Sequence, residues 1–119
     1  LTAIRCKVEE ALNNPEIISK TDFSIDQMAQ LCSMNGKLLS RAINECFHRS
    51  FSILLSESRI KEACKRINDF ERYGNLTIEA ISQSVGFSSR GGFIRAFKRS
   101  TGLTPSEYMA IAKNQKNKH

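Results

Sequence analysis

The stretch GFSSRGGFIRAFKRSTGLTPSEY, Gly86 to Tyr108, decides how the rest of the chain is organised. It contains a tight turn, a basic amphipathic helix, a second turn and the start of another helix. Ser88 is the expected N-cap of the basic helix, because its hydroxyl can accept from a backbone N–H that has no partner within the helix. Gly102 suits the left-handed residue that ends a helix. Residues 104–107 (TPSE) have the pattern of a capping box with proline at the first helical position, so a new helix begins there.

The basic helix has two different sides. Apolar residues recur at the spacing of a buried face: Phe93, Ala96 and Phe97. At about 100° per residue, the opposite side carries Gly91, Ile94, Arg95 and Lys98. Residues 88–99 hold four cations and no acid. A charged face in water has the same pattern, so this helix alone leaves its role open.

Charge is unevenly spread along the chain. The 119 residues carry a net charge of +6, from 18 basic and 12 acidic residues. Residues 1–34 are slightly acidic, and the basic excess lies in residues 35–49, 88–99 and 113–119. This imbalance predicts a polyanionic partner, with DNA, RNA and an anionic membrane surface all possible on charge alone. No signal peptide and no apolar run long enough to span a bilayer is present, which predicts a cytoplasmic location without membrane contact by this fragment.

The four cysteines do not form a metal or disulfide pattern. Cys6, Cys32, Cys46 and Cys64 include no C-x-x-C pair, and each lies in an apolar helical pattern. We therefore expect reduced, buried thiols and no metal or cofactor. Cys46 and His48 fall on different sides of one helix, which argues against a zinc site. No phosphate-loop motif or nucleophile paired with a histidine is found, so no enzymatic activity is expected.

Helical periodicity and capping residues predict an all-α fold of seven helices. Five segments are expected: a leading helix and connection at 1–20, a first lobe at 21–50, a linker helix at 51–72, a second lobe at 73–112 and a basic tail at 113–119. Asn14-Pro15 ends the leading helix, because the residue before proline disfavours helix. The apolar residues of the linker helix do not keep to one stripe, which predicts contact with core at both ends. Arg59, at its middle, is expected to bridge helices.

The chain contains an internal repeat. Ser24-Ile25-Asp26 recurs as Thr77-Ile78-Glu79, 53 positions later. After one extra residue in the second turn, Leu39 to Ile43 match Phe93 to Phe97 at an offset of 54. Each copy is a short helix, a tight turn and a second helix with a basic outer side, which is the helix-turn-helix pattern.

The linker helix sets the separation of the two copies. Twenty residues span about 30 Å, and successive major grooves on one face of DNA are about 34 Å apart. One chain could therefore place two helices in adjacent grooves. This recurrence favours duplex DNA as the partner. A helical protein-interaction module without direct DNA readout is the alternative, and it predicts binding that needs no DNA and survives added salt.

The residues described above resemble the AraC/XylS family of bacterial transcription regulators. The resemblance covers about residues 20–112 and is strongest in IEAISQSVGFSSRGGFIRAFKRSTGLTPSEY. It implies two helix-turn-helix lobes joined by a linker helix, in a transcription factor that binds specific sequences of double-stranded DNA. It also implies a sensor or signalling domain elsewhere in a longer protein, and RNA polymerase is a further expected partner.

The resemblance and the helix faces together give a set of expected DNA contacts. Base contacts are expected from Lys37, Ser40, Arg41, Arg90, Gly91, Ile94 and Arg95. Phosphate contacts are expected from Asn35, Asn44, Ser88, Ser89, Lys98 and Arg99. The family usually has a polar residue at the position of Gly91, so we expect the first lobe to supply most of the sequence readout. Gly91-Gly92 also predicts a loose start to the second basic helix, which alanine at both positions would stabilise.

Overall fold

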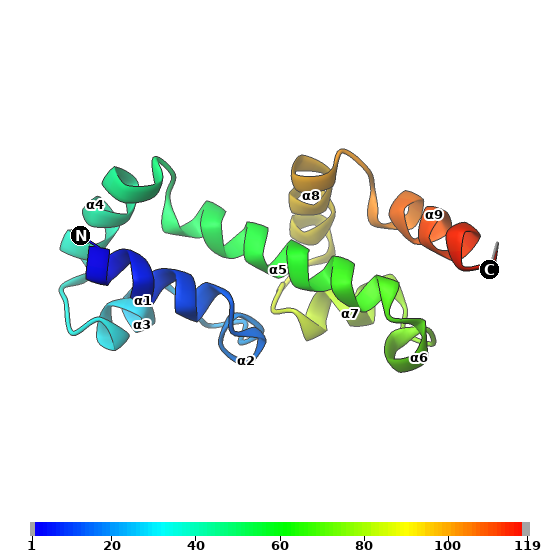
Figure 1. Ribbon diagram of the computed structural model, residues 1–119, viewed down its shortest axis with the longest axis horizontal. Coiled ribbons are helices and arrows are strands. Elements are labelled where there is room, and N and C mark those ends of the chain that lie inside the picture. Colours follow the sequence, from blue (N-terminus) through cyan, green and yellow to red (C-terminus); the bar gives the residue numbers. More distant parts are fainter. Residues whose placement is uncertain (1, 118–119) are drawn as a thin grey trace.

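The computed structural model describes residues 2–117, and within them the chain is entirely helical, as predicted. Nine α-helices follow one another: α1 (Thr2–Leu12), α2 (Pro15–Ile18), α3 (Ile25–Leu31), α4 (Gly36–Phe47), α5 (Phe51–Asn68), α6 (Phe70–Tyr73), α7 (Ile78–Ser84), α8 (Arg90–Thr101) and α9 (Pro105–Asn117) (Figure 1). α9 extends into the segment expected as a basic tail. Residues 118–119 of that segment lie outside the described part.

The expected number of seven helices is too low by two, because two single-turn helices have no sequence periodicity. α2 occupies the expected connection after the leading helix. Asn14 caps it, accepting a hydrogen bond from the Glu16 N–H (3.0 Å), and Pro15 stands at the first helical position. α6 follows α5 directly, and the Asp69 carboxylate accepts from the Arg72 N–H (3.3 Å). The proline that ends α1 therefore also begins a new turn.

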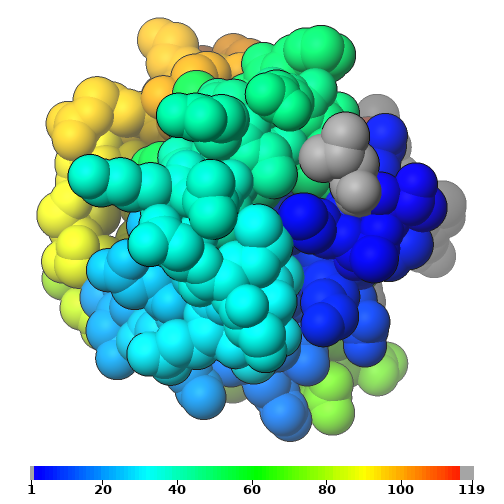
Figure 2. Space-filling view, turned by 90° about the vertical axis from the view of Figure 1, so that its left-hand side faces the viewer, coloured from blue at the N-terminus to red at the C-terminus, as the bar shows by residue number. Residues whose placement is uncertain are grey.

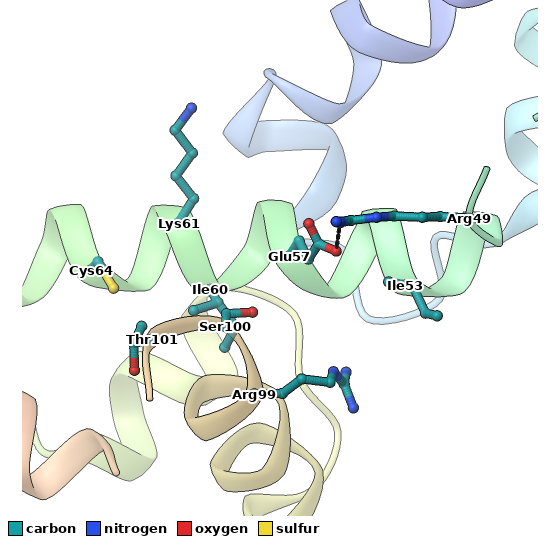
Figure 3. A pocket seen from close by; sticks show the side chains of 9 residues that line it. All are labelled: Arg49, Ile53, Glu57, Ile60, Lys61, Cys64, Arg99, Ser100 and Thr101. Carbon is teal, nitrogen blue, oxygen red and sulfur yellow. Dashed lines mark hydrogen bonds and ion pairs between the residues drawn. The ribbon is translucent and has the colours of Figure 1, made fainter. Parts of the chain in front are cut away.

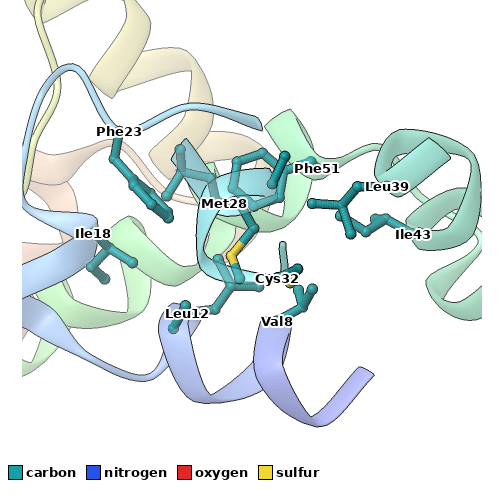
Figure 4. Packing of buried hydrophobic residues seen from close by; sticks show 12 residues of the cluster. Val8, Leu12, Ile18, Phe23, Met28, Cys32, Leu39, Ile43 and Phe51 are labelled. Atoms are coloured by element: carbon teal, nitrogen blue, oxygen red, sulfur yellow. The ribbon is translucent and has the colours of Figure 1, made fainter. Parts of the chain in front are cut away.

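The apolar residues form two separate cores, and α5 contributes to both. The first core contains Phe51 and Leu55 from α5 together with residues of α1 to α4 (Figure 4). The second core contains Ile60, Ala63 and Ile67 from α5 with residues of α7, α8 and α9. This division explains why the apolar residues of α5 keep to no single stripe, and it confirms the predicted contact at both ends.

Each core defines a lobe of an elongated molecule. The first lobe comprises α1 to α4 and the start of α5, and the second comprises the rest of α5 and α6 to α9. α5 runs through the middle between the two groups, which lie at opposite ends of it (Figure 1). The principal extents are 49 × 26 × 22 Å. Packing between elements runs largely through α5.

The cysteines are unlike one another in their surroundings. Cys32 is buried in the first core, and Cys46 and Cys64 are partly buried. Cys6 is exposed on α1, so the expectation that every thiol is buried is wrong at this position. Cys6 lies on the turn of α1 before Val8, Ala11 and Leu12 and faces away from the core that they enter.

Candidate nucleic-acid interface

Two helix pairs of equal dimensions form the repeat that the sequence predicted. α3 and α7 are each seven residues long and lie 53 positions apart, while α4 and α8 are each twelve residues long and lie 54 positions apart. The turn between the helices of each pair contains a left-handed residue at a matched position, Ser33 (φ 53°) and Gly86 (φ 106°). The two units are therefore built in the same way, with the extra residue in the second turn.

The N-terminus of the second helix in each unit is capped by a side chain. Asn35 Oδ1 accepts from the Lys37 N–H (2.8 Å), and Ser89 Oγ accepts from the Gly92 N–H (3.1 Å). Ser89 is therefore the N-cap, and the expected cap at Ser88 is wrong by one residue. The remaining free N–H groups of these first turns carry the positive end of the helix dipole, which suits an anion.

The outer side of α4 is polar and accessible. Leu39, Ala42 and Ile43 are buried. The exposed side carries three of the expected DNA contacts, Lys37, Arg41 and Asn44, with Ser40 half-buried beside them. Asn44 Nδ2 donates to the Ser40 carbonyl (3.0 Å), so this amide is partly engaged within the helix.

The outer side of α8 is more basic than that of α4. Phe93, Ala96 and Phe97 are buried, as the periodicity predicted. Exposed or half-buried residues cover the other side: Ser88, Arg90, Gly91, Ile94, Arg95 and Lys98. The guanidinium of Arg95 lies above Gly91, where a Cβ would stand 3.2 Å from Arg95 Nη1. Gly91 thus leaves room for the Arg95 side chain on the helix surface.

The starts of α4 and α8 lie toward the same side of the molecule. In Figure 2, α3 and α4 (cyan to green) face the viewer and extend toward the left-hand edge. The turn before α8 and its first residues (yellow) lie along the same edge, while α1 (blue) lies at the right. One polyanion on that side could therefore contact both helices.

Arg99 differs from the other expected contacts, because its side chain turns toward α5. Its Nη2 donates to Ser56 Oγ (3.3 Å), and Figure 3 shows it reaching toward the Ile53 end of a groove between α5 and α8. The groove has a volume of about 680 Å³ and is lined by Arg49, Ile53, Glu57, Ile60, Lys61, Cys64, Arg99, Ser100 and Thr101. Arg49 forms an ion pair with Glu57 there. Arg49 and Lys61 are not among the expected DNA contacts, since only the fold places them along the same groove as Arg99.

Two titratable groups near the same groove remain neutral. Burial raises the pKa of the Cys64 thiol and, as the largest of several causes, that of the Tyr108 hydroxyl. Asn68 Nδ2 donates to Tyr108 Oη (3.0 Å). Both pKa values move away from neutrality, so neither group adds negative charge to the basic surface at pH 7.

The described residues include no group of histidine, cysteine or acidic side chains placed to hold a metal ion. Nor does any helix in residues 2–117 combine the length and hydrophobicity needed to cross a bilayer.

Comparisons with known proteins agree with this geometry. Residues 28–111 match a family described as a helix-turn-helix domain. The transcriptional activator AggR of Escherichia coli is 33% identical over 66 residues, which are 56% of this chain and 23% of that protein. The chain therefore spans less than a quarter of the length of this relative.

Solved structures give the same fold over nearly the whole chain. A DNA-binding transcriptional dual regulator from Escherichia coli K-12 has a TM-score of 0.77 and 27% identity, with 93% of each chain covered. The C-terminal domain of AraT, a response regulator from Geobacillus stearothermophilus, has a TM-score of 0.75 and 24% identity, covering 91% of this chain and 84% of that one. At that identity, the second comparison supports the fold alone.

Proposed function

The chain belongs to the AraC/XylS family of helix-turn-helix transcription regulators, and on this premise we propose that it binds double-stranded DNA sequence-specifically. α4 and α8 are the proposed recognition helices, one for each of two successive major grooves. The family comprises DNA-binding domains of transcription regulators, which are not an enzyme class. A cytoplasmic location, contact with RNA polymerase and a sensor or signalling domain beyond this chain are parts of the same proposal.

The observation that carries the proposal is the recurrence of an exposed basic helix face at matched positions of two equal units. Arg41 and Arg95 occupy equivalent places, each opposite a buried apolar side. The 18 residues of α5 span about 27 Å, about 7–9 Å less than the 34–36 Å that separates successive major grooves along one face of DNA. The matched positions in the two units carry more weight than this length, because a solvated face would have no reason to recur at them.

The proposed contacts divide by chemistry. Arg41 and Arg95 can each donate two hydrogen bonds to a guanine edge, and Lys37, Ser40, Arg90, Gly91 and Ile94 lie on the same outer sides. Phosphates would be bound by Lys98, by Ser88 and by the free N–H groups beside the caps Asn35 and Ser89. Asn44 and Arg99 would have to release their present partners, Ser40 and Ser56, before contacting phosphate.

Selection from a random duplex library, followed by footprinting, tests this function. We expect one asymmetric site covering two major grooves, occupied by a single chain in light scattering, because the two recognition helices differ in sequence. Arg41→Ala should weaken binding, while Lys7→Ala, at an exposed lysine of α1 that is not among the proposed contacts, should not.

Two results would count against the proposal. If no sequence is enriched, the exposed faces serve another partner, such as the helical protein surface considered above. If the footprint is a palindrome occupied by two chains, the two lobes do not read one site within one chain.

A further inference from the structure

Arg59 lies on α5 at the boundary between the two cores. Leu55, one turn before it, belongs to the first core, and Ile60, the next residue, belongs to the second. Arg59 is 9% exposed and is the only charged residue that is buried within the described part of the chain. Burial lowers the pKa of its guanidinium, but an arginine starts so far above neutrality that it remains charged. A buried charge requires compensating partners.

The hydrogen-bond partners of Arg59 are in the first lobe. Its Nε donates to the Ile18 carbonyl (2.7 Å) and its Nη2 donates to the Lys20 carbonyl (2.8 Å). The Ile18 carbonyl lies at the end of α2, where a helix leaves carbonyl groups without partners, and the Lys20 carbonyl, in the connection after it, also accepts from the Phe23 N–H (3.1 Å). Hydrogen bonds from a charged donor are stronger than those between neutral groups. The guanidinium therefore holds this segment firmly against α5.

The other contacts of Arg59 are with the second lobe. Its guanidinium carbon lies 5.9 Å from the centroid of the Phe87 ring, in the turn that precedes α8. The neighbouring residue, Gly86, is so close that a Cβ would stand 2.8 Å from Arg59 Nε and 2.7 Å from the Ile18 carbonyl oxygen. Phe87 in turn packs edge to face against Phe93, the buried aromatic of α8, with centroids 5.2 Å apart.

These contacts form one continuous path from the first lobe to the second recognition helix. It runs from the Ile18 and Lys20 carbonyls through Arg59 and Phe87 to Phe93. We propose that Arg59 is a positioning residue that fixes the second recognition helix relative to the first lobe, and thereby the half-site spacing that the protein accepts. The inference rests on the proposed DNA binding.

The physical reason is that a single helix is a weak constraint on the angle between two lobes. Long helices are rarely straight and curve gently along their length, and the packing of both lobes runs largely through α5. Arg59 adds a second connection between the lobes beside α5. This connection fixes the angle between the two lobes. A fixed angle raises the effective concentration of the second lobe at its half-site once the first is bound.

The test measures tolerance of altered spacing. The probe is the duplex selected by the wild-type chain and a copy with one base pair inserted between the half-sites, which rotates the second half-site by about 35°. The wild-type chain should lose about 100-fold in affinity on insertion, the order by which a correctly placed second module raises binding. Arg59→Gln should bind the selected duplex more weakly and lose less than about tenfold on insertion, because its lobes can adjust their angle.

Arg66→Gln is the matched control. Arg66 lies on the same helix and also donates to a backbone carbonyl, from Nη1 to Ser84 O (3.2 Å), but its partners Glu62, Ser84 and Tyr73 all lie in the second lobe or in that part of α5. It should lower stability without changing the cost of the insertion. Arg59→Lys keeps the positive charge but cannot donate to both carbonyls through a planar guanidinium. Its loss of affinity on insertion should fall between those of the wild type and Arg59→Gln. It replaces Arg59→Gln in the test if that variant does not fold. An insertion cost equal to that of the wild-type chain would overturn the proposal.

A second measurement needs no DNA. Residual dipolar couplings of the free chain should fit one alignment tensor for both lobes in the wild type and in Arg66→Gln, but two tensors in the Arg59 variant. If the wild type selects no DNA site, the proposed function fails while this measurement still tests the connection between the lobes. If one tensor fits the Arg59 variant, contacts other than those of Arg59 fix the orientation of the two lobes, and the proposal fails.

Discussion

His48 and Gly102 end α4 and α8 in the same left-handed conformation, 54 positions apart. His48 has φ 56° and ψ 28°, and Gly102 has φ 81° and ψ −2°. A residue with a Cβ is strained there by about 1–2 kcal/mol, whereas glycine is not. His48→Gly should therefore stabilise the chain by about 0.5–1 kcal/mol, since the flexibility of glycine in the unfolded chain offsets part of the gain. Urea unfolding at neutral pH measures the change.

Gly102→Ala is the reciprocal control. No heavy atom outside its neighbours lies within 4 Å of the position of its Cβ, so alanine would add backbone strain without a clash. We expect a loss of about 1 kcal/mol. If His48→Gly also lowers stability, the His48 side chain contributes something that the left-handed backbone does not explain.

Phe97 and Arg41 separate folding from binding. Phe97 is fully buried, with its ring 5.6 Å from that of Phe93 and 5.4 Å from that of Tyr108. Phe97→Ala should cost about 3–5 kcal/mol of stability and unfold mainly the second lobe. Arg41→Ala should leave the melting temperature unchanged and cost about 1–3 kcal/mol of binding, with relaxed specificity. Equal destabilisation in thermal melts would show that the faces are wrongly assigned.

The sequence predicted the fold wherever a helix carries a cap and an apolar stripe. Ser50 and Thr77 cap α5 and α7, and the Thr104–Glu107 box is present in both directions, at 2.9 and 3.2 Å. The prediction missed α2 and α6 because a single turn has no period to detect. It placed the α8 cap at Ser88 because adjacent serines are equivalent in sequence, and only backbone geometry distinguishes Ser88 from Ser89.

The candidate site was predicted less completely than the fold. The outer sides of α4 and α8 follow from helical spacing, so Arg41 and Arg95 could be found from sequence. The bridging role expected for Arg59 is confirmed by its bonds to Ile18 and Lys20, but its contact with Phe87 joins residues that are 28 positions apart. The turn of Arg99 toward Ser56 likewise depends on how α8 crosses α5. No local pattern records such contacts.

Binding of DNA should be steeply dependent on salt. With about five to eight phosphates neutralised, the logarithm of affinity should fall against the logarithm of salt concentration with a slope of about −4 to −7. Lys98→Ala, which removes an exposed cation from α8, should reduce that slope by about one. Lys7→Ala on α1 should leave it unchanged. Titration of the selected duplex measures all three, and a flat wild-type response would argue against phosphate contacts.

Gly91 and Gly92 lie in the first turn of α8, and the structure separates their roles. Each glycine costs a helix about 0.8–1 kcal/mol relative to alanine. At Gly91 a Cβ would meet only the mobile end of Arg95, so Gly91→Ala should stabilise the free chain by nearly that amount. At Gly92 a Cβ would stand 2.9 Å from Ser89 Oγ, the cap that accepts from the Gly92 N–H. Losing that cap costs about 1 kcal/mol, so Gly92→Ala should gain nothing, and the stabilisation expected of the double change should come from Gly91 alone.

The same pair of glycines bears on how sequence readout is divided between the lobes. The Arg95 guanidinium lies over Gly91, so the first turn of α8 offers DNA bare backbone, this flexible arginine and the exposed Arg90. The first turns of α4 offer Lys37, Ser40 and Arg41. Base substitutions under the first lobe should therefore cost about 1–3 kcal/mol of binding free energy each, and those under the second should cost less, except at the base that Arg95 contacts.

Gly91→Ala would displace the Arg95 guanidinium and should weaken discrimination at that base while raising the stability of the free chain. A base-by-base scan of the selected site with both proteins decides this, and equal costs under the two lobes would show that α8 reads sequence as fully as α4.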